Sequence, residues 1–425
     1  MKLKILGGGG EVGRAAYVIE ERNVKILLDY GVNFDERDNP QLPLHVRPVD
    51  LSGLIISHAH LDHVGAAPYL FITGEVKAFA TRPTLEIARY LILDFLKLNT
   101  PFIEYELRDF EKMFAATEFL KYGEFYDNDS FRIEFYNAGH ILGSTASVIE
   151  LPSGHRVLYT GDINNLETWT LNGAQLPDTR VDTVIIESTY GARNHPPRKS
   201  VEDQLLKIVE ETVDRGGTVL IPAFSVGRGQ EILAMLASQA PYLDIYIDGM
   251  VKDVTEVYLM HSSFLKDPVL FKRAIESVNF VTGHRDRRKI INKPCVIIAS
   301  AGMLKGGPSV YYLKKIADNS RNTIVLVSYQ APNSGGHELL ETGSLTSHEV
   351  KDVKARVFWL DFSSHAGKRG LIELVSKYKS TVRNIILVHG SKEEAAILAE
   401  GIRDALGADV NVYIPSNGEE ITLNV

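Results

Sequence analysis

The stretch His58-Ala59-His60-Leu61-Asp62-His63 sets three imidazoles and one carboxylate within six residues, directly after the apolar run Leu54-Ile55-Ile56. An apolar run that ends in such a loop is typical of a buried strand. Neutral imidazole nitrogen and carboxylate oxygen suit Zn²⁺ and similar ions. One ion cannot easily use all four side chains. We therefore expect His58 and His60 to hold one metal, with Asp62 and His63 available to a second, as in two-metal hydrolases.

Two further segments place candidate ligands after strand-like runs. His140 follows the run from Ile133 to Tyr136 and the break at Gly139, and Asp162 follows the run from Arg156 to Thr160 and Gly161. Either residue alone is more typical of an ordinary loop. Together with the first cluster both become candidate metal ligands, and Asp162 offers a carboxylate that can bridge two ions.

The glycine stretch Gly8-Gly9-Gly10-Glu11-Val12-Gly13 matches the dinucleotide-binding fingerprint. That fingerprint requires a helix next. Instead, the β-prone segment from Ala15 to Ile19 turns at Glu21-Arg22-Asn23 into another strand-like run, Val24 to Leu28, and leaves no room for a crossover helix. We expect a hairpin here, with the glycines forming a sharp turn beside the site.

Composition narrows the class of protein. The 425 residues, 44% of them hydrophobic, can bury a large core in two or three domains. No apolar run approaches eighteen residues and Met1 enters a strand without a signal-peptide pattern, so we expect a cytoplasmic protein without a membrane partner. The single cysteine, Cys295, is expected to be a buried thiol. A net charge of −8 excludes a generally basic surface, so any nucleic acid must be held locally.

Strands alternate with helices through most of the chain, which predicts an α/β fold. The strand from Asp182 to Glu187 is followed by a polar stretch that is a plausible boundary. Two later strand-like runs end in His365 and His389. The other histidines stand in polar contexts and are expected on the surface or on helices: His45, His155, His195, His261, His284, His337 and His348.

In this order of residues the chain resembles the metallo-β-lactamase superfamily, whose motifs are an aspartate, a His-x-His-x-Asp-His run, a lone histidine and a second aspartate. Here these are Asp29, the run from His58 to His63, His140 and Asp162. The resemblance implies an αββα sandwich. It also implies that Asp29, at the end of the strand from Val24, supports the ligands without binding metal.

Glu187, His365 and His389 resemble the three further motifs of the β-CASP branch, whose members cut nucleic acids. The segments 223–231, 299–303 and 385–390 resemble those of the nuclease subunit of the cleavage and polyadenylation specificity factor and its archaeal relatives. The implied architecture is a metallo-β-lactamase domain over 1–189 and 357–425, with an α/β β-CASP domain over 190–356 and the active site in the cleft between them.

The resemblance also implies roles. One metal takes His58, His60 and His140, the other takes Asp62, His63 and His389, and Asp162 bridges them. The expected cofactors are two Zn²⁺, with Mn²⁺ as the alternative, and a hydroxide between them attacks phosphorus. His365 protonates the leaving oxygen and Glu187 orients its ring. A histidine at position 389 favours RNA, since DNA-cutting members of the branch carry an apolar residue there.

Arg228 is a candidate for contact with the RNA phosphate. Because it starts a helix, a purely structural role is equally compatible with the sequence. Ser363, Ser364 and Ala366 resemble the loop that holds the 5′-terminal phosphate in ribonuclease J, with free backbone N–H groups. That favours 5′–3′ exonuclease activity. The opening glycines look nearer to the endonucleases, and the chain is expected to lack both the KH domains of the larger archaeal relatives and the extra C-terminal domain of ribonuclease J.

Three functions remain open on the sequence. The first is a zinc-dependent ribonuclease in RNA processing or decay, acting alone, as a homodimer or within a complex. The second is a metal-dependent hydrolase of small esters or thioesters, against which the long insertion argues. The third is an inactive scaffold subunit, against which the complete ligand set argues.

Overall fold

The structure, a computed structural model, describes residues 1–99 and 101–423. Its backbone contacts divide the chain into two units. The first, the core unit, comprises Met1–Glu167, Asn172–Asn194 and His365–Val425, and the second, the inserted unit, comprises Thr168–Leu171 and His195–Ser364.

The first sheet of the core unit has the order β22-β1-β2-β3-β6-β7-β8. β2 and β3 form an antiparallel hairpin in which Glu21 lies opposite Val24. The predicted hairpin is confirmed, and no helix follows the glycine stretch. Strands β3, β6, β7 and β8 run parallel. The strand bounds are β1 (Lys2–Gly7), β2 (Ala16–Glu21), β3 (Val24–Leu28), β6 (Gly53–Ile55), β7 (Ala78–Ala80), β8 (Thr117–Phe119) and β22 (Glu420–Thr422), with the separate pair β4 (Asn33–Phe34) and β5 (Pro40–Gln41).

The second sheet has the order β21-β20-β13-β12-β11-β10-β9. β12, β13, β20 and β21 are parallel, and β13 is buried at every position, as expected for a strand covered on both faces. Its strands are β9 (Phe125–Asp127), β10 (Arg132–Asn137), β11 (Thr145–Glu150), β12 (Arg156–Tyr159), β13 (Thr183–Glu187), β20 (Asn384–Val388) and β21 (Asn411–Tyr413).

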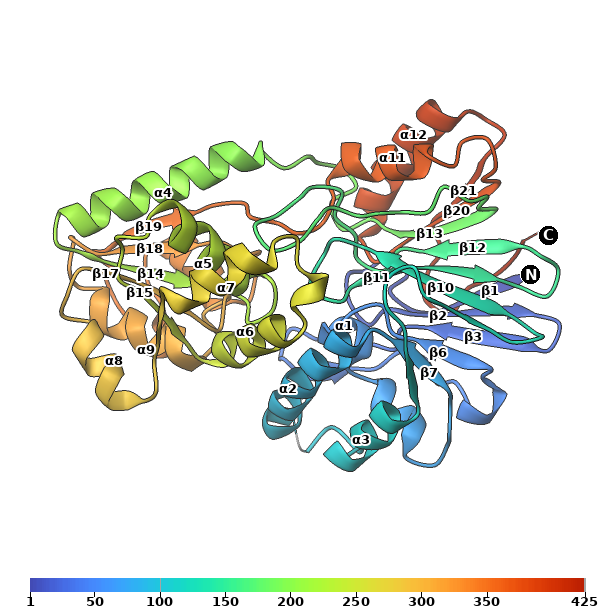
Figure 1. Cartoon of the computed structure of the whole chain (residues 1–425), viewed down its shortest axis with the longest axis horizontal. Coiled ribbons are helices and arrows are strands. Elements are labelled where there is room, and N and C mark those ends of the chain that lie inside the picture. Colours follow the sequence, from blue (N-terminus) through green and yellow to red (C-terminus); the bar gives the residue numbers. More distant parts are fainter. Residues whose placement is uncertain (100, 424–425) are drawn as a thin grey trace. The chain divides into compact units, whose positions relative to one another are not determined.

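The two sheets of the core unit pack face to face. Ile5 and Ile26 of the first sheet share one buried cluster with Phe135 and Ile185 of the second. Helices α11 and α12 cover the other face of the second sheet, and α1 to α3 lie beside the first (Figure 1). This is the predicted αββα sandwich. The helices are η1 (Pro48–Asp50), α1 (Leu61–Val64), η2 (Ala67–Phe71), α2 (Arg82–Asn99), α3 (Leu107–Ala115), α11 (Lys368–Ser376) and α12 (Lys392–Leu406).

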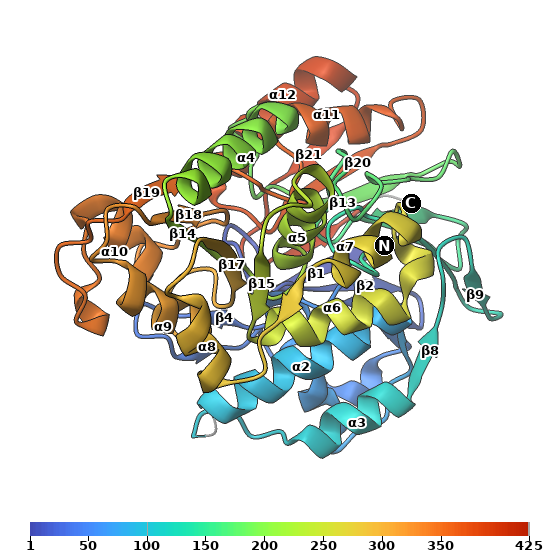
Figure 2. The same cartoon turned by 60° about the vertical axis from the view of Figure 1, so that its left-hand side comes forward.

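The inserted unit is built on a parallel sheet with the order β16-β15-β17-β14-β18-β19. Its helices pack around that sheet (Figure 2). The strands are β14 (Thr218–Pro222), β15 (Ile245–Asp248), β16 (Asn279–Phe280), β17 (Cys295–Ala299), β18 (Thr323–Leu326) and β19 (Arg356–Trp359). The helices are α4 (Arg198–Asp214), α5 (Arg228–Gln239), α6 (Met250–Met260), η3 (Ser262–Phe264), α7 (Pro268–Glu276), α8 (His284–Ile290), α9 (Gly307–Ile316), α10 (Gly335–Thr342) and η4 (Thr346–His348).

The division of the chain differs from the expected boundaries at 189/190 and 356/357. Strand β19 pairs with β18, with Leu326 opposite Trp359, so it completes the sheet of the inserted unit. The core unit resumes only at His365, and the inserted unit also takes in the short segment Thr168–Leu171. A strand that joins a sheet at its edge carries no sequence signal for which sheet it joins.

Two histidines differ from expectation. His155 is buried, with Nε2 2.9 Å from the hydroxyl of Thr183, and the half-buried His195 lies with Nδ1 2.8 Å from Asp361. The partners of both rings are distant in the sequence, so the polar residues beside each histidine did not indicate its burial. Cys295 is buried as predicted. Among the described residues no helix is long and apolar enough to cross a membrane.

Candidate metal centre

The candidate ligands come from strand ends of both sheets of the core unit. The loop after β6 carries His58 and His60, and Asp162 follows β12. Glu187 ends β13, and His389 follows the neighbouring strand β20, whose Val388 lies opposite Glu187. The carboxyl ends of parallel strands meet at one edge of a sheet, so residues far apart in the sequence converge there.

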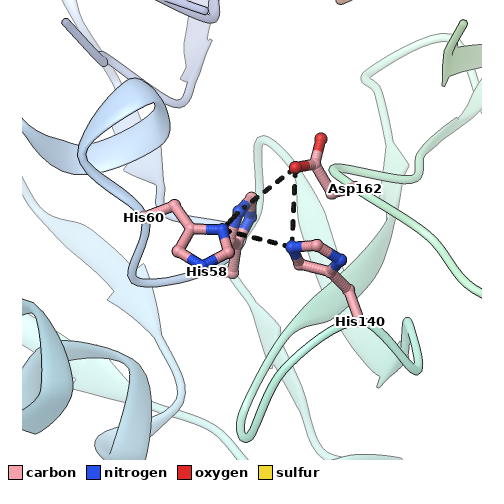
Figure 3. A group of neighbouring side chains, drawn as sticks. All are labelled: His58, His60, His140 and Asp162. Atoms are coloured by element: carbon pink, nitrogen blue, oxygen red, sulfur yellow. Dashed lines mark hydrogen bonds and ion pairs between the residues drawn. The ribbon is translucent and has the colours of Figure 1, made fainter. Parts of the chain in front are cut away.

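Four side chains form the first group: His58, His60, His140 and Asp162 (Figure 3). His60 Nδ1 lies 3.2 Å from both His58 Nε2 and His140 Nε2. Asp162 Oδ2 lies 3.4 Å from His58 Nε2 and 3.6 Å from His140 Nε2. A tetrahedral ion with bonds of about 2.1 Å separates its ligand atoms by about 3.4 Å. The four atoms therefore stand at the spacing of one tetrahedral shell.

The second group consists of Asp62, His63 and His389. His389 Nε2 lies 3.3 Å from Asp62 Oδ2, and His63 Nε2 lies 3.2 Å from Asp162 Oδ1. Both atoms of this last pair are buried and neither makes a hydrogen bond, although they lie at ion-pair distance from each other and His389 Nδ1 lies 3.3 Å from the same oxygen of Asp162. Buried polar atoms are nearly always satisfied, so a facing pair of such atoms fits a cation that would bind both. With Oδ2 toward the first group and Oδ1 toward the second, Asp162 is placed to bridge.

Asp29 supports this cluster without joining either group. Its carboxylate lies 2.7 Å from His63 Nδ1 and accepts from the backbone N–H of Ser57 at 2.7 Å and from its hydroxyl at 2.6 Å. The hydroxyl of Tyr159 donates to it as well. A carboxylate on the far nitrogen of a metal-binding histidine fixes the tautomer and aims the near nitrogen at the metal. Ser57 and Tyr159 were missed from the sequence, although Ser57 directly precedes His58.

The glycine turn contacts the second group. His389 has a left-handed backbone, with φ of 48°, and its N–H donates to the carbonyl of Gly8 at 2.7 Å. Gly8 itself has φ of 73°, and a Cβ there would meet the hydroxyl of Tyr17 at 2.3 Å. Only glycine fits this turn. The turn beside the site thus holds the backbone that presents His389.

His365 and Glu187 form a pair beside the first group. His365 Nδ1 lies 2.9 Å from both carboxylate oxygens of Glu187, which also accepts from the N–H of Ile163 at 2.7 Å. The other nitrogen of His365 is 3.9 Å from Asp162 Oδ2. Burial lowers the pKa of His365, but the charges of Glu187 and Asp162 outweigh it and raise this pKa to about 9. The pKa therefore favours a protonated ring whose Nε2 lies on the side of the ligand cluster.

The pKa values of the candidate ligands shift in different directions. Burial lowers the pKa of His58 and of His60, which keeps both rings neutral as metal ligands require. At His63 burial acts in the same direction, but the carboxylates of Asp162 and Asp29 outweigh it and raise the pKa. At Asp162 burial is outweighed in turn by the surrounding histidines, which lower its pKa.

The expected substrate residues have partners within the protein. Arg228 is buried in the inserted unit, ion-paired with Glu231 and 3.3 Å from the hydroxyl of Ser364. The backbone N–H of Ser363 donates to Asp361 at 3.0 Å, and that of Ala366 donates to Ile163 at 2.7 Å. The free N–H groups expected at Ser363 and Ala366 are therefore not found, because Ser363 donates within its own loop and Ala366 donates to the loop after β12.

Three domain models match the chain in order. They are a metallo-beta-lactamase superfamily domain over residues 18–189, a Beta-Casp domain over 230–339 and a Zn-dependent metallo-hydrolase RNA specificity domain over 350–415. The chain is also 45% identical to RNase aCSPSF2 of Saccharolobus solfataricus, over 99% of this chain and 85% of that one. It belongs to the β-CASP branch of the metallo-β-lactamase superfamily.

Two further relatives also align with nearly the whole of this chain. It is 35% identical to Probable RNase MJ4 of Methanocaldococcus jannaschii over 100% of both chains, and 35% identical to Transcription termination factor FttA of Pyrococcus horikoshii over 98% of this chain and 70% of that one. Among solved structures, a protein of unknown function from Enterococcus faecalis V583 shares the fold, with a TM-score of 0.63, 12% identity and 99% of each chain covered.

Proposed function

We propose that this protein is a metal-dependent ribonuclease that hydrolyses phosphodiester bonds of RNA with two divalent cations, zinc fitting the ligands best. The observation that carries the proposal is the facing pair of buried, unbonded atoms, His63 Nε2 and Asp162 Oδ1, beside the tetrahedral group of Figure 3. Two adjacent groups that share one carboxylate correspond to a two-metal hydrolase.

The proposed ligands divide between two ions. His58, His60 and His140 hold the first, Asp62, His63 and His389 hold the second, and Asp162 belongs to both. The bound cations would supply an ionised water near neutral pH and neutralise charge on the phosphate oxygens. Asp29 holds the ring of His63 in the orientation that leaves Nε2 for the metal.

His365 is proposed as the general acid. Its Nε2 faces the ligand cluster while Nδ1 is held by Glu187, so a proton on Nε2 is available to the oxygen that leaves phosphorus. Glu187 keeps the ring charged and oriented. No serine or cysteine nucleophile is needed in this scheme.

The relatives support RNA as the substrate. Two of them carry the name RNase, and one of these matches from end to end. The complete ligand set argues against an inactive scaffold. The large inserted unit, with a six-stranded sheet of its own, argues against a hydrolase of small esters, which needs only a lid.

One experiment tests the proposal and its direction of cutting. Metal content is measured by elemental analysis, and RNA labelled at either end is then digested with 5′-triphosphate, 5′-monophosphate or 5′-hydroxyl termini. We expect about two metal ions per chain and RNA cleavage that a chelator abolishes. Internal fragments from circular RNA identify an endonuclease, and mononucleotides released from the 5′ end identify a 5′–3′ exonuclease. Full activity without a transition metal contradicts the proposal.

A further inference from the structure

Helices α8 and α9 of the inserted unit carry a run of positive charge on an acidic protein. Between positions 287 and 317 the sequence has seven lysines and arginines and no aspartate or glutamate, while the whole chain has a net charge of −8. Such segregation is unusual for a merely solvated face, where both signs alternate.

Six lysines and arginines between positions 285 and 315 are exposed, and one of them, Lys305, lies between the two helices in the sequence. The five on the helices form what we call the α8–α9 basic surface: Arg285, Arg288, Lys289, Lys314 and Lys315. On α8 the exposed residues follow each other around one side, since Ile290 faces inward and is 3% exposed. On α9, Tyr312, Leu313 and Ile316 are buried and leave the opposite side to the two lysines.

Tyr311 joins the two helices. Its ring centroid lies 6.2 Å from that of His284 and 5.8 Å from the guanidinium of Arg287. Lys314 and Lys315 follow Tyr311 by three and four residues and therefore share its side of α9. Arg288 follows His284 by four residues on α8. The exposed cations thus flank one aromatic contact, and the two helices lie side by side (Figure 2).

Two neighbouring cations are ion-paired with aspartates, whereas the five have weaker contacts, the charges of Lys289 and Arg285 helping to lower the pKa of the nearby Asp286. Arg287 binds Asp248 through two hydrogen bonds, and Lys293 pairs with Asp244. In the part of the chain that the structure describes, none of the five has an ion pair. The one acid of α8, Asp286, accepts hydrogen bonds from both the N–H and the hydroxyl of Thr282.

Helix-end electrostatics account for only part of this charge. Arg288, Lys289, Lys314 and Lys315 stand in last turns, where cations are favourable. Arg285 stands in the first turn of α8, where the helix dipole disfavours a cation. Asp286 is one acid beside three exposed cations of α8, and α9 has no acid, so the surface keeps an excess of positive charge.

We propose that the α8–α9 basic surface binds the phosphate backbone of RNA outside the metal centre. The proposal rests on the proposed ribonuclease function for its choice of polyanion. Lysines and arginines that contact phosphate release counterions from the RNA. Binding of this kind depends on charge and not on the RNA sequence. None of the exposed large hydrophobic side chains lies between positions 281 and 317, so nothing there would insert into a lipid surface.

The test compares charge removal on this surface with a matched change elsewhere on the same unit. The variants are Arg285→Gln/Arg288→Gln/Lys289→Gln, Lys314→Gln/Lys315→Gln and the two combined. The control is Lys199→Gln/Lys207→Gln on α4, where both exposed lysines are paired with acids one turn away. Binding of a labelled 30-nucleotide RNA to the full chain is read by stopped-flow anisotropy, before cleavage, at several salt concentrations.

We expect the combined variant to weaken RNA binding by about tenfold or more near 0.1 M salt and to reduce the slope of log K against log salt by about 0.7 for each phosphate that the variant no longer neutralises. The control should change neither quantity. Cleavage of an RNA too short to span both sites should keep its kcat. Arg285→Lys/Arg288→Lys should bind as the parent does, because the charge is kept.

Unchanged binding and salt slope in the combined variant, with normal thermal stability, would overturn the proposal and leave the ribonuclease function standing. Vesicle binding, measured with phosphatidylserine vesicles, that is lost in the combined variant while RNA binding persists would overturn it in favour of a membrane. Loss of RNA binding in a protein that cuts no RNA would support the surface and contradict the function.

Discussion

His63 Nδ1 lies 2.7 Å from the carboxylate of Asp29, and the opposite nitrogen of the same ring faces Asp162 at 3.2 Å. One imidazole therefore lies between two buried carboxylates, which we propose to be the supporting and the bridging one.

Asp29→Asn should lower metal affinity by about 10- to 100-fold, as replacements of supporting carboxylates do, because the amide cannot hold the ring as a charged acceptor. Metal titration with a competing chelator measures this. Glu21→Gln is the control, since Glu21 is also a buried carboxylate bonded to a serine. Equal affinity of the Asp29 variant and the parent would refute the supporting role.

His389→Val should reduce the metal content from about two ions to about one per chain and cut RNA hydrolysis severely, because the second group loses a ligand. His155→Val removes a buried histidine outside both groups and should keep both ions. RNA cleavage that survives the His389 change with both ions in place would rule out its role as a ligand.

His365→Ala should keep both metals and RNA affinity, yet lose about 10²–10⁴ in rate, the usual contribution of a general acid. An RNA with a sulfur leaving group at the scissile position needs no protonation and should restore much of that rate. Absence of rescue with intact metal content would leave His365 as a positioning residue.

Glu187→Gln should cost less rate than His365→Ala and should change the pH profile. The charge of Glu187 raises the pKa of His365, so its removal lowers that pKa. Activity that depends on protonated His365 is lost as pH rises through this pKa. The alkaline limb of the kcat profile should therefore move to lower pH, and an unmoved limb would separate Glu187 from the acid.

Chelation should lower the melting temperature, because ions that bind only the folded chain stabilise it, by about 2.7 kcal/mol at a hundred times Kd. The metal of the first group should be retained as pH falls through the ordinary histidine range of about 6.5, since burial lowers the pKa of His58 and His60 and keeps them neutral. Calorimetry and metal analysis at stepped pH check both effects. Complete release of metal above pH 7 would contradict them.

The candidate ligands that the structure brings together could be selected from the sequence because they follow strand-like runs, as His58 follows Ile56 and His389 follows Val388. The contacts of Ser57 and Tyr159 with Asp29 could not be predicted from the sequence. They form only when the folded chain brings β12 and the loop after β6 together. The amides of Ser363 and Ala366 show the opposite case. Their sequence favours a phosphate loop, while their hydrogen bonds are satisfied within the protein.

The two groups of candidate ligands are completed at different stages of protein synthesis. The first lies within residues 58–162, whereas the second needs His389, whose N–H binds Gly8 at the other end of the chain. While a ribosome is still adding the inserted unit, the growing polypeptide has no second group. If cutting needs both groups, as we propose, a cell that makes this protein beside its own messenger RNA meets no cutting activity until synthesis has passed β20.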